Sequence, residues 1–186
     1  MRSTTPTATN ILPRTRRHCL EALAACALLA SADGVRAAVP AAAPRLHCEW
    51  SVAPAGRAGA PVVLHFALVN RGRQAAHVLE WGTPFEGWLA PFVEVLRDST
   101  LLTYAGASVK RGDPDRSEYL TLAPGARREV TIDLAEAFDL RAAGSHVLRP
   151  RITLHDVYLG AAAANRPRSR HCAVNLDCPE LRFSLN

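Results

Sequence analysis

The stretch Pro61-Val-Val-Leu-His-Phe-Ala-Leu-Val-Asn70 is an alternating run of apolar side chains that ends at a turn signal. Successive side chains of a β-strand point to opposite faces, so every second residue of this run shares a face. The residues expected to form a core face are Val62, Leu64, Phe66 and Leu68. Asn70-Arg-Gly72 then predicts a turn, and a second apolar run follows at residues 78–81. The stretch therefore predicts an antiparallel β unit.

Further short strands are predicted along the rest of the chain, with turns at roughly regular spacing and almost no helix. Pro124-Gly125 suits a type II turn, because proline fixes φ and glycine accepts a positive φ at the next position. Residues 134–140 suit a single helical turn. Pro150 lies inside a predicted strand, which favours an edge position or a bulge. The expected strands cover residues 45–52, 61–70, 76–81, 92–97, 101–104, 119–122, 129–134, 145–156 and 181–185. Eight or nine such strands predict an all-β fold, an immunoglobulin-like antiparallel β-sandwich.

The first 37 residues have the pattern of an export signal. Arg14, Arg16 and Arg17 form a basic front, and residues 22–32 form an apolar run too short to span a bilayer. Small residues before position 38 predict cleavage after Ala37. Residues 38–44 are then a linker, and residues 45–186 a single β-sandwich domain.

Two export signals compete in this segment. Residues 15–20 are similar to a twin-arginine motif, whereas Leu23-Ala-Ala-Cys26 is similar to a lipobox that would make Cys26 a lipidated N-terminus. Glu21 interrupts the apolar run before the lipobox, which favours the non-lipidated form. We expect a periplasmic or secreted protein by the Sec or the twin-arginine route, membrane-attached only if Cys26 is lipidated.

The charge of the chain gives no case for nucleic acid. The formal net charge is +5, of which residues 1–37 contribute +3 and the remainder +2. A domain so close to neutral lacks the basic face that nucleic-acid binding requires.

Three cysteines lie beyond the predicted cleavage point: Cys48, Cys172 and Cys178. An exported chain meets oxidising conditions, so one disulfide is expected. Cys48 lies in the first predicted strand, and the other two flank the start of the last one. A bridge from Cys48 to either would join the two ends of the domain, and the sequence leaves both pairings open.

The sequence carries no recognised catalytic constellation. It has no His-Glu-x-x-His motif, no Gly-x-Ser-x-Gly motif and no glycine-rich phosphate loop. We therefore predict a non-enzymatic protein without cofactor or metal. An alternative is a diverged metal-binding or hydrolytic protein, in which the pairs His47-Cys48 and His171-Cys172 hold zinc or copper. Disulfide formation is the simpler fate of these thiols in an exported chain.

Candidate binding residues lie in two predicted loops, residues 82–91 and 104–118, because function commonly resides in loops that a rigid scaffold presents. They are Phe85, Glu86, Trp88, Tyr104, Lys110 and Arg111. The aromatic residues, with Trp81, suit either core packing or a binding surface. Lys110 and Arg111 suit either local ion pairs with Glu86 or Asp113, or contact with a partner.

These loops also carry a resemblance to a known family. The matching residues are Phe66, Leu68, Asn70, Trp81, Thr83, Pro84, Glu86, Gly87, Tyr104, Gly106, Lys110, Arg111, Pro114, Tyr119, Leu122, Pro124 and Gly125. In this pattern the chain resembles the N-terminal β-sandwich domain of bacterial deuterolysin-type (aspzincin) metalloendopeptidases. The resemblance covers about residues 45–157, with Phe85 where that family has leucine and Phe138 where a tyrosine is usual. A catalytic domain does not follow, so the resemblance implies a stand-alone accessory module without peptidase activity.

The leading functional expectation is an exported, non-enzymatic module that binds another protein. The resemblance points to a secreted peptidase as that partner, in an accessory, inhibitory or chaperone-like role. A structural interaction domain of the cell envelope is a further alternative.

Overall fold

The computed structural model describes residues 43–53, 56–162 and 166–186. The chain divides into two units, Met1–Val39 and Pro40–Asn186, and all the described structure lies in the second. The predicted export signal, its twin-arginine and lipobox motifs, Cys26 and most of the predicted linker lie outside the described residues.

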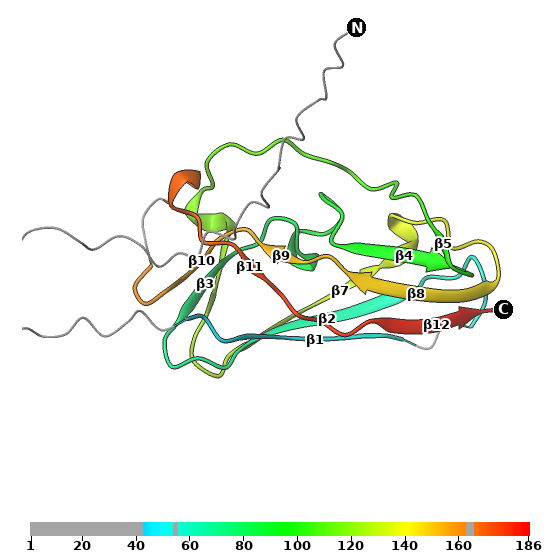
Figure 1. Cartoon of the computed structure of the whole chain (residues 1–186), viewed down its shortest axis with the longest axis horizontal. Coiled ribbons are helices and arrows are strands. Elements are labelled where there is room, and N and C mark those ends of the chain that lie inside the picture. Colours follow the sequence, from blue (N-terminus) through cyan, green and yellow to red (C-terminus); the bar gives the residue numbers. More distant parts are fainter. Residues whose placement is uncertain (1–42, 54–55, 163–165) are drawn as a thin grey trace, which may run out of the picture. The chain divides into compact units, whose positions relative to one another are not determined.

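The described residues form twelve short strands and four 3-10 turns (Figure 1). In this part of the chain, no helix combines the length and apolar character needed to cross a membrane. The strands are β1 (Leu46–Val52), β2 (Val63–Asn70), β3 (Ala76–Leu79), β4 (Val93–Arg97), β5 (Thr100–Leu101), β6 (Tyr119–Leu122), β7 (Arg127–Asp133), β8 (Gly144–Pro150), β9 (Thr153–Leu154), β10 (Val157–Leu159), β11 (Val174–Asn175) and β12 (Leu181–Leu185). The turns are η1 (Pro84–Glu86), η2 (Arg116–Glu118), η3 (Leu134–Glu136) and η4 (Arg168–Arg170).

Two antiparallel sheets carry most of the core. One has the order β1-β2-β7 and the other β12-β8-β4-β5, and two smaller sheets, β10-β3-β6 and β11-β9, complete the fold. Buried side chains from both large sheets join in one hydrophobic cluster. The predicted all-β, sandwich-like fold is confirmed. The strand number exceeds eight or nine because the predicted 145–156 strand divides into β8 and β9, and the predicted 158–178 loop contributes β10 and β11.

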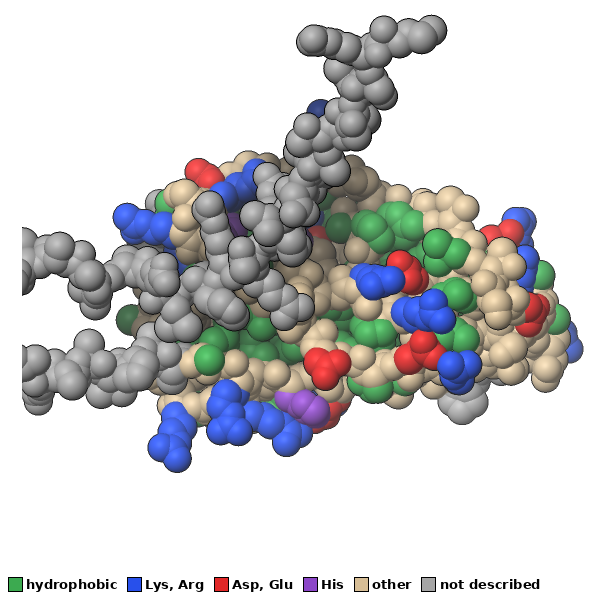
Figure 2. Space-filling model, in the orientation of Figure 1, with side chains coloured by type: hydrophobic (Ala, Val, Ile, Leu, Met, Phe, Trp, Pro, Cys, Tyr) green, Lys and Arg blue, Asp and Glu red, His purple; other side chains and the backbone are tan. Residues whose placement is uncertain are grey.

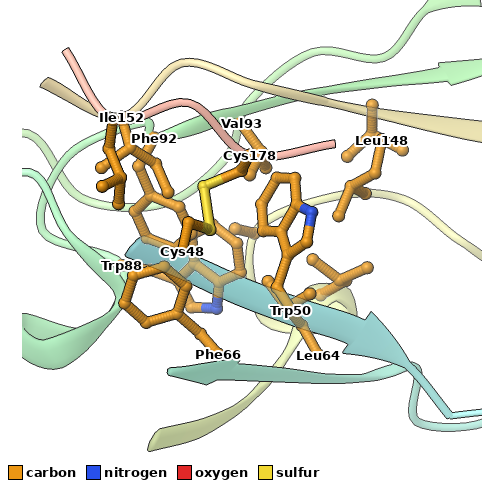
Figure 3. Close-up of a cluster of buried hydrophobic side chains, with 14 of the residues drawn as sticks. Cys48, Trp50, Leu64, Phe66, Trp88, Phe92, Val93, Leu148, Ile152 and Cys178 are labelled. Carbon is orange, nitrogen blue, oxygen red and sulfur yellow. A yellow bond between two sulfur atoms is a disulfide. The ribbon is translucent and has the colours of Figure 1, made fainter. Parts of the chain in front are cut away.

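The predicted core face of the opening stretch is confirmed at the level of burial, and Ala67 on the opposite face is buried as well. Leu64 and Leu68 are fully buried and Phe66 is 1% exposed, whereas His65 faces solvent. Strand β1 pairs with β2 so that Trp50 lies opposite Phe66. Tryptophan and phenylalanine therefore share the core face (Figure 3).

A disulfide links Cys48 of β1 to Cys178, just before β12 (Figure 3). The structure therefore selects Cys178 over Cys172, which lies half-buried outside this bond. The indole N–H of Trp50 donates to the Pro179 carbonyl at 2.7 Å, so β1 and the C-terminal segment are joined twice. The Cys48–Cys178 disulfide indicates an oxidising environment outside the cytoplasm.

The predicted edge position for Pro150 does not hold for β8 as a whole, but it holds locally at Pro150. Strand β8 lies inside its sheet, between β12 and β4. Pro150 is its last residue and pairs only with Val93 of β4, because the pairing with β12 has already ended at Leu148. A proline is tolerated there because no ladder bond is required of it on the β12 side.

Asn70, fully buried at the end of β2, joins three loop segments. Its side-chain amide donates to the carbonyls of Gln74 and Leu122 and accepts from the N–H of Gly72. Its backbone carbonyl also accepts from Gly125 of the type II turn, where φ is +76°.

Replacing Asn70 with alanine is expected to cost about 3 kcal/mol of unfolding free energy, because one buried and two partly buried backbone groups lose their partner. Urea denaturation measures this loss. Asn175→Ala, which removes one exposed hydrogen bond with Thr153, serves as the control and should cost much less. Equal losses for both variants would contradict the assigned role of Asn70.

The buried side chain of His146 is expected to make the folded protein less stable at acidic pH. His146 of β8 is fully buried against Phe183, and its Nδ1 lies 3.0 Å from the Gly144 carbonyl, while Nε2 has no hydrogen-bond partner among the described residues. Burial lowers the pKa of His146 below its ordinary value of 6.5, and the nearby charge of Arg97 lowers it further. The hydrogen bond with Gly144 and the charge of Asp98 raise this pKa but do not outweigh the lowering. The stability that the neutral, buried imidazole of His146 allows is therefore fully present above pH 6.5. It is lost as pH falls through the lowered folded-state pKa, because the ring must then be protonated.

We expect the stability difference between wild type and His146→Leu to shift in favour of the variant as pH falls from 7 to 5. Thermal unfolding midpoints at several pH values test this shift. A pH-independent difference would show that His146 does not resist protonation in the folded state.

Candidate functional site

The 82–91 loop begins with a turn whose residues each have a structural role. Gly82 adopts a φ of +65°, which favours glycine, and its N–H donates to Glu86 at 2.6 Å. Thr83 caps η1 by accepting from the N–H of Phe85, and Pro84 occupies the first position of this turn. The indole N–H of Trp81 donates to Glu118 at 2.7 Å. These contacts account for the Trp-Gly-Thr-Pro-Phe-Glu-Gly segment as a rigid turn.

Glu86 joins this loop to the 104–118 loop. One carboxylate oxygen accepts from Gly82, and the other accepts from the guanidinium of Arg111 at 2.6 Å. Arg111 lies over the Trp81 ring, 5.2 Å from its centroid, and 3.8 Å from Glu118. The local ion pair considered for Arg111 is therefore present, and both oxygens of Glu86 are engaged.

Trp88 and Tyr104 belong to an aromatic cluster of the core. Trp88 is 8% exposed, stacks on Phe92 with ring centroids 4.5 Å apart, and donates its indole N–H to the Asp133 carbonyl (Figure 3). Tyr104 contacts Trp88 and Phe138, and its hydroxyl lies 3.0 Å from the Trp88 carbonyl. Burial, with a smaller effect of Glu86, raises the pKa of the Tyr104 phenol.

The Tyr104-Ala-Gly106 sequence has a steric explanation. A Cβ placed on Gly106 would lie 2.3 Å from the Tyr104 hydroxyl, closer than any real contact. The N–H of Ala107 donates to the Trp88 carbonyl and that of Ala105 to the Ala137 carbonyl. The start of the 104–118 loop is thus held against the aromatic cluster.

The six predicted binding residues therefore divide into different environments. Trp88 packs in the core, Tyr104 is half-buried beside it, and Phe85 lies edge-on against Phe66. Lys110 is exposed. Only Glu86 and Arg111 line the cleft described next.

A cleft of about 350 Å³ opens where three loops meet. Its lining residues are Trp81, Gly82, Glu86, Leu89, Ala90, Val109, Arg111, His155, Arg168 and His171. Val109 is 41% exposed, and the only other large apolar side chain that stands exposed among the described residues is Leu101, in β5. The cleft thus combines an apolar wall with cationic and imidazole groups.

The third loop, described over residues 166–172, is anchored by a buried carboxylate. Asp156 is fully buried and accepts from Arg166 at 2.6 and 3.0 Å, from the Tyr119 hydroxyl and from the N–H of Cys172. Burial raises the pKa of Asp156, but these hydrogen bonds outweigh it and leave the pKa below its ordinary value. The Arg166 guanidinium also lies over the Tyr158 ring.

Sequence reasoning missed most of the cleft and its anchor. His155 and Arg168 lie in segments that carry no motif, and Val109 lies in a predicted loop without being singled out there. The proximity of these three residues depends on loop packing. Asp156 offered one signal, since it is an acidic residue inside the apolar run of residues 152–159. Its partner, ten residues further on, has no sequence signature.

The zinc or copper site considered as an alternative would lack one of its four predicted ligands, Cys48. Cys48 is bonded to Cys178, so its sulfur is not available as a thiolate beside His47, His171 and Cys172. Within residues 43–53, 56–162 and 166–186, no three histidine, cysteine or acidic side chains gather as a metal site. Of the acidic loop residues, Asp113 accepts from the N–H of Arg168, and Asp115 caps η2.

The outer face of the β12-β8-β4 sheet differs from the cleft. Basic and acidic side chains alternate across it (Figure 2). Arg149 and Arg182 pair with Glu180, and Arg151 pairs with Glu94 at 2.9 Å. The charged side chains of this face pair with one another, so they are less available to a ligand, and the cleft is the stronger candidate site.

Replacing Glu86 with alanine is expected to lower the unfolding free energy by about 2 kcal/mol, because the Gly82 N–H and the Arg111 guanidinium lose their acceptor. Denaturant unfolding measures the loss. The matched control, Glu129→Ala, removes an exposed glutamate and should have little effect. A Glu86 variant as stable as that control would contradict the assigned role in joining the two loops.

The chain matches no family model and no curated protein in the comparisons made. The resemblance to the N-terminal domain of deuterolysin-type peptidases thus remains a prediction from the residues quoted above.

Proposed function

We propose that this protein is an exported, non-enzymatic module that binds another protein through the cleft. The observation that carries the proposal is the meeting of three internally bonded loops around an exposed apolar residue, Val109. Rigid loops favour binding because little conformational entropy is lost when a partner docks.

Preorganisation is supported by the contacts between the loops. The pair Glu86–Arg111 joins the first two loops, and Arg168 joins the second to the third through hydrogen bonds to Arg111 and Asp113. The third loop is fixed in turn by Asp156 and Arg166. Each wall of the cleft is therefore held by a charge-assisted bond, which is stronger than a neutral one.

A location in the periplasm or outside the cell is part of the proposal. It is supported by the Cys48–Cys178 disulfide, which forms where thiols are oxidised, and by the signal pattern of residues 1–37.

A secreted peptidase is the partner class that we propose. Its support is the resemblance of the residues from Trp81 to Gly125 to a domain that accompanies a secreted metalloendopeptidase. The role that follows is accessory, inhibitory or chaperone-like.

A photo-crosslinking residue at position 109 tests the binding site. We expect Val109 replaced by benzoylphenylalanine to yield a discrete adduct with an exported peptidase in the producing organism, identified by mass spectrometry. The same residue at Leu101, the other exposed large apolar position, is the matched control and should give no such adduct. Unlabelled protein should compete for the adduct, whereas Val109→Glu should not.

Adducts of equal yield from both positions, or none from position 109, would refute binding through the cleft. A specific adduct with a protein that is not a peptidase would retain the binding function and reject the proposed partner class. Peptide turnover by the purified chain would overturn the non-enzymatic role.

A further inference from the structure

Arg168 is the cleft residue with the most unused hydrogen-bonding capacity. Its backbone N–H donates to Asp113 at 3.1 Å, and one guanidinium nitrogen donates to the Arg111 carbonyl at 3.0 Å. A guanidinium has five N–H donors, so most of those on Arg168 remain. None of the ion pairs found among the described residues involves Arg168, in contrast to Arg111 and Arg166.

The one carboxylate among the described lining residues, by contrast, is already engaged. Glu86 is the only carboxylate among the described lining residues, and its two oxygens accept from Gly82 and Arg111. The lining therefore offers donors to a ligand but no unengaged carboxylate. A ligand that brings acceptors complements the free donors of Arg168, and a guanidinium matches a carboxylate in a bidentate geometry.

The apolar part of the cleft adds a second requirement. Leu89 and Ala90 are half-exposed, and Val109 is 41% exposed, so a partner gains by covering them. A ligand group that is charged but has no apolar part would leave the surface of Leu89, Ala90 and Val109 exposed to water.

We propose that the cleft recognises an acidic side chain next to an apolar one on a peptide segment of the partner. Arg168 receives the carboxylate, and the surface of Leu89, Ala90 and Val109 receives the apolar side chain. This inference rests on the proposed protein-binding function and specifies the chemistry of the segment that is bound.

Two synthetic peptides that differ in one group test the inference. They are Ac-Gly-Ser-Glu-Leu-Ser-Gly-NH2 and its Gln-Leu twin, titrated into the full chain while NMR follows the Trp81 indole and the Val109 methyl groups. We expect the glutamate peptide to bind at least about tenfold more tightly, since a charged hydrogen bond is at stake. Arg168→Gln should abolish this preference, and Arg168→Lys should retain part of it.

The matched control is Arg170→Gln, which removes an exposed arginine of the same turn η4 that is not among the lining residues. It should leave the preference within about twofold, since the charge of an exposed arginine outside the lining is screened by solvent. Equal effects of the Arg168 and Arg170 changes would overturn the inference in favour of a general basic surface. Inorganic phosphate that produces the same shifts and displaces the peptide would overturn it in favour of a free-anion site.

Failure of this inference is distinguishable from failure of the proposed function. If both peptides bind equally, or neither binds, while position 109 still crosslinks a partner, the cleft binds protein without reading an acidic residue. If position 109 yields no adduct and neither peptide shifts the cleft resonances, both proposals fall.

Discussion

Replacing Asp156 with asparagine is expected to lower the unfolding free energy by about 3–5 kcal/mol, among the largest effects of any single substitution in this domain. The Asp156 side chain is fully buried, and its partner Arg166 is 19% exposed. Removing the anion leaves a largely buried guanidinium without compensation, which costs more than the pair itself contributes. Tyr119 and the N–H of Cys172 lose a charged acceptor at the same time.

The consequences should be strongest in the third loop. Asp156 connects residues 166 and 172 to β6 through Tyr119. Hydrogen exchange should therefore accelerate in residues 166–175 of the variant before it accelerates in β2. Urea denaturation gives the global loss, and the exchange pattern locates it.

The effect of Asp156 should also depend on pH. Because the pKa of Asp156 in the folded state lies below its ordinary value of 3.8, the carboxylate contributes its stability above that value. This contribution is lost as pH falls through the folded-state pKa. The stability difference between wild type and Asp156→Asn should thus be constant from pH 7 to 5 and shrink below pH 4.

Asp139→Asn is the control for this experiment. Asp139 pairs with Arg141 on the surface, where solvent screens the interaction, so its removal should leave the unfolding midpoint nearly unchanged. A loss for Asp156→Asn no larger than that of the control would mean that residues 166–172 are not held by the buried pair.

Removing the disulfide is the second change with a large expected effect. Cys48 and Cys178 are separated by 130 residues, so the bond restricts the unfolded chain strongly. In the chain-entropy model a loop of this length corresponds to about 5 kcal/mol, and measured losses on removing a native disulfide are about 2–5 kcal/mol. We expect Cys48→Ala/Cys178→Ala to unfold at a markedly lower denaturant concentration than wild type.

The reduced wild type and the Cys172→Ala variant complete this test. Reduction should reproduce the loss seen in the double variant, whereas Cys172→Ala under oxidising conditions should keep most of the stability, because it leaves the Cys48–Cys178 bond intact. If Cys172→Ala were as unstable as the double variant, or reduction had no effect, the assigned pairing would be wrong.

Local patterns in the sequence were sufficient for most of the strands and for the tight turn at Pro124-Gly125. The two-residue alternation from Val62 to Leu68 fixes which side chains face inward whatever sheet they join. The Pro124-Gly125 turn depends on backbone preferences of adjacent residues, and Gly125 adopts the expected positive φ. Information within a few residues therefore determined the all-β class.

The candidate site was predicted in part for the same reason. Glu86 and Arg111 lie in predicted loops, and their pairing was one of two interpretations that their charges allowed. Trp88 shows the limit of this reasoning, because a tryptophan in a loop suits either a surface or a core. Its burial beside Phe92 follows from the position of β4, which no local pattern specifies.

Residue order alone determined the alternating strands, the turn at Pro124-Gly125 and the need of Cys48 for a distant partner. Only the tertiary structure decided that this partner is Cys178, that Asp156 neutralises Arg166, and that Arg168 reaches a carbonyl 57 residues away. The physical reason is that these contacts depend on how sheets and loops stack in space. Their free energy arises between segments whose separation along the chain leaves no periodic trace in the sequence.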